Sequence, residues 1–104
     1  MTGLALQDIE IIIGILSKYP NVEKAMFFGS RAKGNYRPGS DIDIALSGEG
    51  TSELIARISG ELNDETPLPY TFDVVSLENL ENKDLRDHIM RVGIVFFKHN
   101  LPDQ

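Results

Sequence analysis

Residues 28–46 read FGSRAKGNYRPGSDIDIAL, and they carry the strongest indication of fold and chemistry in the chain. The hydrophobic segment Val22–Phe28, which runs into Gly29, predicts a strand. Apolar residues alternate with aspartates in Asp41–Leu46, which predicts a second strand. Gly, Arg, Lys and Pro are frequent in residues 30–40 between them, a composition typical of a loop. The stretch therefore predicts two strands joined by a polar, positively charged loop.

The two aspartates of the second strand are expected to share one face. Successive side chains on a strand alternate between faces, so Asp41 and Asp43 point the same way. Ile42 and Ile44 then point the opposite way, into the core. Two adjacent carboxylates repel each other, and their site is favourable mainly when a cation lies between them. Because oxygen ligands alone favour Mg²⁺ or Mn²⁺, the spacing predicts a divalent metal site.

A third carboxylate, Asp73, lies in Tyr70–Val75, whose aromatic and β-branched residues predict another strand. If this strand lies beside the second one, Asp73 completes a three-carboxylate cluster. Such a cluster can hold two divalent ions, one activating a hydroxyl and one neutralising a leaving pyrophosphate. The alternative for Asp73 is a surface-facing position on a half-buried strand, and the sequence leaves both open.

The loop between the first two strands is suited to binding phosphate. Gly29 and Ser30 place free backbone N–H groups and one hydroxyl where a strand turns, and Gly29 allows a ligand to approach the backbone closely. Arg31, Lys33 and Arg37 concentrate positive charge in this short loop, and Arg31 can contact a triphosphate with two hydrogen bonds. For Lys33 and Arg37 a solvated basic loop is the simpler interpretation.

The rest of the chain predicts alternating helices and strands. The resulting order α-β-β-α-β-α-β predicts one α/β (α+β) domain over residues 1–104, with a mixed four-stranded sheet packed by about three helices. The further elements expected are a helix over Leu4–Tyr19, a helix capped by Ser52, a turn over Leu77–Leu80, a helix from Asn82 to Arg91 ended by Gly93, and a strand over Ile94–Phe97.

The first helix carries two apolar stripes, which admit two interpretations. It is either buried between a sheet and a second helix, or it presents a face to a partner protein. The main stripe is Ile9, Ile12, Ile13 and Leu16, and the second is Leu4, Ile11 and Ile15.

Composition excludes several classes of protein. Ten Lys and Arg residues against sixteen Asp and Glu residues give a net charge of −6, which argues against general nucleic-acid binding. The absence of cysteine excludes disulfides, thiol catalysis and cysteine zinc sites. No apolar run is long enough to span a membrane, and the first residues lack the basic region of a secretory signal. We therefore expect a cytoplasmic protein.

The motif GSRAKG followed by SDIDIAL closely resembles the polymerase-β-like nucleotidyltransferase superfamily, and within it the minimal nucleotidyltransferases (MNT). The resemblance implies that two Mg²⁺ ions, or Mn²⁺ in their place, bind the carboxylates, and that the third carboxylate is also the general base. It further implies that a serine next to the aspartate pair orients a carboxylate. The implied nucleotide-binding residues are Gly29, Ser30 and Arg31, the implied catalytic and metal-binding residues are Asp41, Asp43 and Asp73, and the orienting serine is Ser40.

The same resemblance implies a function. Minimal nucleotidyltransferases commonly pair with an all-helical HEPN protein as antitoxin and toxin, so the expected activity is transfer of AMP from ATP to a hydroxyl of such a partner. A tyrosine hydroxyl is the expected acceptor, within a hetero-oligomer of the two proteins. Two alternatives remain open: transfer to a small molecule such as an aminoglycoside, and an antitoxin that acts by binding alone.

Overall fold

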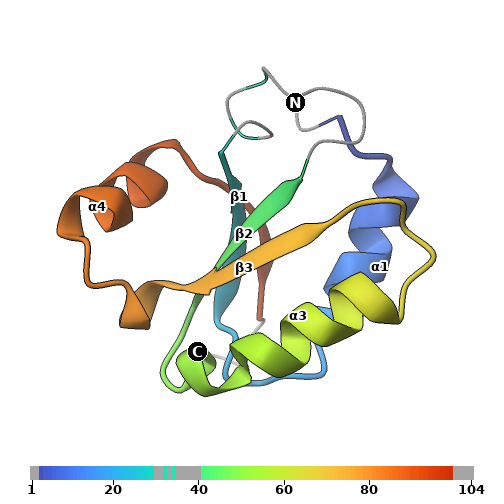
Figure 1. Cartoon of the computed structure of the whole chain (residues 1–104), viewed down its shortest axis with the longest axis horizontal. Helices are drawn as coiled ribbons and strands as arrows, with labels where there is room; N and C mark the ends of the chain where they lie inside the picture. Colours follow the sequence, from blue (N-terminus) through green and yellow to red (C-terminus); the bar gives the residue numbers. More distant parts are fainter. Residues whose placement is uncertain (1–2, 30–31, 33, 35–40, 100–104) are drawn as a thin grey trace.

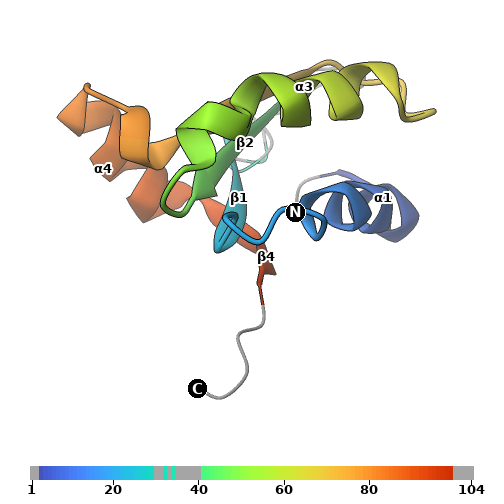
Figure 2. The ribbon, with the colours of Figure 1, turned by 90° about the horizontal axis from the view of Figure 1, so that it is seen from below.

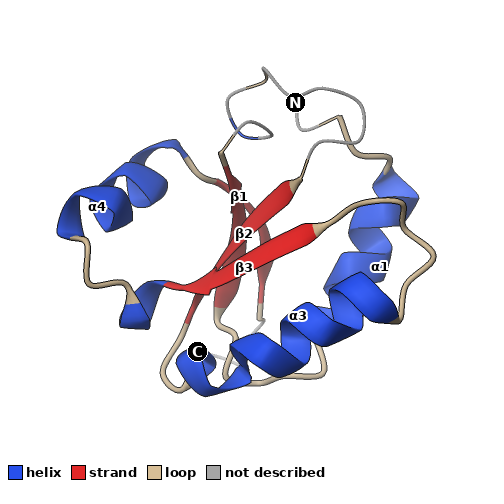
Figure 3. Cartoon of the chain, in the orientation of Figure 1, coloured by secondary structure: helices blue, strands red, loops and turns tan. Residues whose placement is uncertain are grey.

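A computed structural model describes residues 3–29, 32, 34 and 41–99 of the chain. Three α-helices and a four-stranded mixed sheet are formed within these ranges, an α+β fold that confirms the predicted class and element order (Figures 1 and 3). Two short 3₁₀ helices, η1 and η2, complete the described elements. The elements are α1 (Leu6–Leu16), β1 (Lys24–Phe28), β2 (Ile42–Ser47), η1 (Thr51–Leu54), α3 (Ile55–Asp64), β3 (Phe72–Ser76), η2 (Leu77–Asn79), α4 (Lys83–Val92) and β4 (Ile94–Lys98).

The strand order in the sheet is β3-β2-β1-β4. β1 is antiparallel to both of its neighbours, whereas β2 and β3 are parallel. In register, Phe28 pairs with Asp43, and Ile42 pairs with Phe72. The end of β1 and the beginnings of β2 and β3 therefore meet at one end of the sheet (Figure 1).

Helices cover both faces of the sheet, and Figure 2 shows α1 and α4 on opposite sides of the strands. α1 and α3 pack on one face and form the larger core, in which Ile12, Phe27, Ile44 and Ile58 are fully or almost fully buried. α4 and η2 cover part of the other face with a smaller cluster. That cluster comprises Met26, Ala45, Leu77 and Ile89.

The stripes of α1 are largely accounted for by packing within the domain. Ile12 and Leu16 are completely buried, and Ile9, Ile13 and Ile15 pack partly against the same core. Packing within the domain thus accounts for these residues, and α1 lies on the same face of the sheet as α3. The helix is shorter than predicted, because it spans only Leu6–Leu16 and the chain then turns toward β1.

The predicted cap of the second helix is wrong. Ser52 lies inside the 3₁₀ helix η1, and α3 begins only at Ile55. The carboxylate of Glu78 accepts hydrogen bonds from the Gly50 N–H (3.0 Å), the Ser52 N–H (3.2 Å) and the Ser52 hydroxyl (2.9 Å). A distant side chain thus satisfies the free N–H groups that a local cap would otherwise take.

The last helix begins and ends as predicted. The Asn82 side chain caps α4 by accepting a hydrogen bond from the Leu85 N–H at 3.0 Å, and Gly93 follows its last turn. Within residues 3–29 and 41–99, no helix combines the length and apolar character needed to cross a membrane.

Candidate functional site

Asp43 and Asp73 are directly paired in the parallel register of β2 and β3. Their side chains lie on the same face of the sheet as Ala45, which belongs to the smaller cluster under α4. Asp43 is partly buried and Asp73 is exposed, so the pair lies at the border of the region that α4 covers. The strand that carries Asp73 therefore lies beside the strand that carries Asp43, which is the condition under which the sequence predicted that these carboxylates come together.

Gly29 lies against the carboxylate of Asp43. Its φ of +72° belongs to the left-handed region that favours glycine. A Cβ built on Gly29 would overlap Oδ2 of Asp43 and come within 3.2 Å of its Cγ. Gly29, after β1, and Asp43 of β2 are therefore in close contact, and a side chain at position 29 would overlap the carboxylate.

The electrostatics of the site favour a cation. Burial raises the pKa of Asp43 above its ordinary value, and the negative charges of Asp73 and Asp41 raise it further. The negative charges of Asp73 and Asp41 thus act on the Asp43 carboxyl. A divalent ion would remove this repulsion, and the available donors are oxygen atoms, which suit Mg²⁺ and Mn²⁺.

The predicted site is only partly described by the structure. Asp41, Asp43, Asp73 and Gly29 are described, while Ser30, Arg31 and Ser40 lie outside the described residues, as do Lys33 and Arg37. Within the described ranges, no group of three or more His, Asp and Glu side chains is arranged as a metal-binding cluster. Ligation by all three carboxylates therefore stays a prediction, which the pairing of two of them supports.

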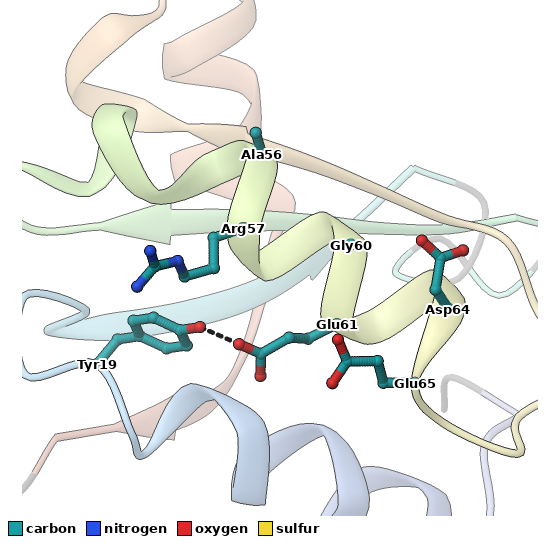
Figure 4. Close-up of a pocket in the computed structure, with 7 residues that line it drawn as sticks. All are labelled: Tyr19, Ala56, Arg57, Gly60, Glu61, Asp64 and Glu65. Carbon is teal, nitrogen blue, oxygen red and sulfur yellow. Dashed lines mark hydrogen bonds between the residues drawn. The ribbon is translucent and has the colours of Figure 1, made fainter.

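A second polar cluster, which no pattern in the sequence predicted, lies between the end of α1 and α3. The Tyr19 hydroxyl donates a hydrogen bond to Glu61 (Figure 4). Lys18 Nζ lies 2.6 Å from Glu61 Oε1. Burial and the hydrogen bond to Glu61 raise the pKa of Tyr19 to about 12. The contacts with Lys18 and Tyr19 lower the pKa of Glu61. These partners are more than forty residues apart, and no local motif connects them.

This cluster borders a groove of about 600 Å³ on the outer side of α3. Figure 4 shows Arg57 beside the Tyr19 ring and Glu65 next to Glu61. Tyr19 belongs to the core under α1 and α3, so the groove lies on the face of the sheet opposite the aspartate pair. The cluster links α1 to α3, and it contributes nothing to the site around Asp43.

Comparison with known proteins identifies the family of the chain. The family described as Polymerase beta, Nucleotidyltransferase matches residues 10–101. The chain belongs to this nucleotidyltransferase family. The match extends over α1 from its second turn, the aspartate pair and all four strands, so the family resemblance inferred from residues 28–46 is confirmed.

Solved structures confirm the fold of this nucleotidyltransferase domain. A toxin–antitoxin structure with AMP-PNP superimposes with a TM-score of 0.73 at 22% identity, over 88% of this chain and 74% of the other. The toxin–antitoxin MntA-HepT gives a TM-score of 0.69 at 20% identity, over 90% of this chain and 73% of the other. An aspartate-to-glutamate mutant of MntA-HpeT gives 0.70, also at 20% identity, over 88% and 74% of the two chains. No curated protein matches the sequence significantly.

Proposed function

We propose that this nucleotidyltransferase domain transfers AMP from ATP to a hydroxyl group of a protein. The observation that carries the proposal is the direct pairing of Asp43 with Asp73 beside Gly29, at the end of the sheet where the family motif lies. Carboxylates on adjacent strands next to a glycine turn place metal-binding oxygens beside a site for phosphate.

The residues fit a divalent metal. Asp41, Asp43 and Asp73 would hold Mg²⁺, with two ions as the expected number and Mn²⁺ as a substitute. Burial raises the pKa of Asp43 and the negative charges of Asp73 and Asp41 raise it further, a repulsion that a cation would relieve. When bound, the metal supplies charge neutralisation for the triphosphate and lowers the pKa of an attacking hydroxyl.

The chain's own residues orient the reaction. The bare backbone at Gly29 leaves room for the phosphates, and Ser30 and Arg31 are proposed to contact them, with Ser40 holding an aspartate in place. Asp73 accepts the proton of the acceptor hydroxyl. The hydroxyl oxygen then bonds to the α-phosphorus as the bond to the β-phosphate oxygen breaks, and pyrophosphate leaves. Most of the acceleration comes from positioning and charge.

A HEPN-type toxin is the proposed acceptor protein, with this chain as its antitoxin. Three solved structures with the same fold are toxin–antitoxin complexes, one of them containing the ATP analogue AMP-PNP. A tyrosine of the toxin would receive the AMP within a hetero-oligomer. The experiment below also tests two alternative functions, which are transfer to a small molecule and neutralisation of the toxin by contact alone.

The test uses the purified chain, Mg²⁺, ATP radiolabelled at its α-phosphate, and lysate of the source cells. We expect one labelled protein band with the wild-type chain, the same band with Asp87→Asn, an exposed aspartate of α4, and none with Asp43→Asn. Labelling by Asp43→Asn at the wild-type rate would overturn the assignment. A labelled small molecule in place of a protein would identify the alternative acceptor. Toxin neutralisation by an Asp41→Asn, Asp43→Asn double variant would favour contact alone.

A further inference from the structure

The outer edge of β3 is unpaired in the described part of the sheet. β3 is the terminal strand in the order β3-β2-β1-β4, and β2 is its sole partner there. Such an edge exposes backbone N–H and C=O groups that can pair with another extended chain. Because β3 also carries Asp73, a chain paired along this edge would lead directly to the carboxylates.

Asn63 shows which backbone groups of β3 point outward. Its side-chain amide accepts a hydrogen bond from the Phe72 N–H at 2.8 Å and donates one to the Phe72 carbonyl at 3.1 Å. This two-point contact imitates the pairing of a neighbouring strand. In a parallel ladder the backbone groups of alternate residues point to the same side, so those of Val74 and Ser76 point outward as well.

A groove of about 570 Å³ runs along this edge, between α3 and η2. The β3 part of its lining comprises Val74, Val75 and Ser76, so the groove borders the outer edge of the strand. Val74 and Ser76 are otherwise buried, with 7% and 5% of their surface exposed. None of the described residues that line it is charged. The remaining lining residues are Ser52, Ile55, Ala56, Ser59, Asn79 and Leu80.

Charged side chains at the two ends of the groove indicate which charges a bound segment should carry. Asp73 precedes the lining residues of β3, and Glu78, bonded to the lining residue Ser52, follows them. One cation is also near, since the Arg86 guanidinium donates to the Leu80 carbonyl at 2.9 Å. Among these three described residues two carboxylates stand against one guanidinium, which favours a segment with a basic side chain at the Glu78 end.

We propose that the β3 groove binds an extended, mainly uncharged segment of the acceptor protein by adding a strand to the sheet. The segment pairs with the backbone of Val74 and Ser76, places a Lys or Arg beside Glu78, and presents its hydroxyl at Asp73. Val75 lies two residues from Asp73, a distance of about 7 Å along a strand. This inference rests on the proposed function, because it names how the acceptor of that same site is held.

The test blocks the groove from either wall. Ala56→Trp and Asn79→Trp place an indole in it from α3 and from η2, at positions that are exposed in the free chain. Arg57→Trp and Glu81→Trp are the matched controls, because each is the same exposed substitution beside a blocked position but outside this groove. The protein labelled by the wild-type chain in lysate is purified and used as the acceptor.

We expect each blocking variant to raise the KM for the acceptor protein by about tenfold, which corresponds to about 1.4 kcal/mol of binding. The KM for ATP and the melting temperature should stay at the wild-type values, and the two controls should behave as wild type. Unchanged acceptor KM in both blocking variants would overturn the groove assignment and leave the proposed function standing. Absence of any labelled protein with the wild-type chain would overturn both.

Discussion

Asp43 on β2 and Asp73 on β3 face each other in parallel register, thirty residues apart in sequence. Parallel neighbours in this register carry their side chains on the same face of the sheet. Two carboxylates are thereby fixed side by side with Gly29 packed against one of them. The energetic consequence is repulsion in the free chain, and the functional consequence is a site suited to a divalent cation and a phosphate.

Magnesium should stabilise the chain in a pH-dependent way. The pKa of Asp43 is raised, so its ionisation costs folding free energy as the pH rises through its folded-state pKa. Mg²⁺ binds the ionised form, and should therefore raise the melting temperature above that pKa and lose its effect below it. Thermal unfolding with Mg²⁺ and with EDTA across the acidic range measures this. An equal shift in Asp43→Asn would contradict it.

Replacing Gly29 by alanine should destabilise the chain and displace Asp43. The substitution combines a φ of +72° with a Cβ that overlaps the Asp43 carboxylate, and together these should cost about 1–3 kcal/mol. Gly14→Ala is the control, because a Cβ there meets nothing within 4 Å, and alanine favours the helix by about 0.5–1 kcal/mol. Denaturant unfolding should give opposite signs for the two variants. Equal stabilisation by both would show that Gly29 is under no constraint.

Asp73→Asn should separate catalysis from nucleotide binding. If Asp73 accepts the acceptor's proton, its amide variant should lower kcat by about a hundredfold or more, the usual size of a general-base contribution. Binding of Mg²⁺-ATP should weaken less, because Asp41 and Asp43 remain. Steady-state kinetics measures kcat, and calorimetry measures the affinity for Mg²⁺-ATP. An unchanged kcat would show that Asp73 is a surface residue without a catalytic role.

Glu61→Gln should weaken the chain without affecting transfer. The pKa of Glu61 is lowered by its contacts with Lys18 and Tyr19, so its contribution is present above its unfolded-state pKa and is lost as the pH falls through the folded-state value. At neutral pH we expect a loss of about 1 kcal/mol, and a smaller loss in acid. Glu65→Gln, at an exposed neighbour, is the matched control in urea unfolding. A large fall in transfer rate would show that this face does serve the reaction.

Local patterns in the sequence predicted most elements of the fold. The alternation in residues 41–46 specified which side of β2 is buried, and Asn82 and Gly93 marked the ends of α4. The helical segment that leads into α3 was missed because the free N–H groups of Gly50 and Ser52 are satisfied by Glu78, which is 26 residues from Ser52. No local signal reports such a contact.

The candidate site, too, was predictable where it depends on local patterns and unpredictable where it depends on long-range contacts. The spacing of Asp41 and Asp43 predicts a common face, since that depends only on the period of a strand, although Asp41 lies just before β2. The pairing of Asp43 with Asp73 required β3 to lie beside β2 in one particular register, which long-range packing decides. The groove along β3 depends on the same packing, and was therefore invisible in the sequence.

Nucleotidyl transfer is measured by offering one acceptor protein two differently labelled forms of ATP. We expect the acceptor to gain radioactivity from ATP labelled at the α-phosphate and none from ATP labelled at the γ-phosphate, with the γ-label recovered in pyrophosphate. The α-label on the acceptor and the γ-label in pyrophosphate should both disappear with Asp43→Asn and persist with Asp87→Asn. Acceptor labelling from the γ-phosphate, or transfer by Asp43→Asn at the wild-type rate, would contradict nucleotidyl transfer at the paired aspartates.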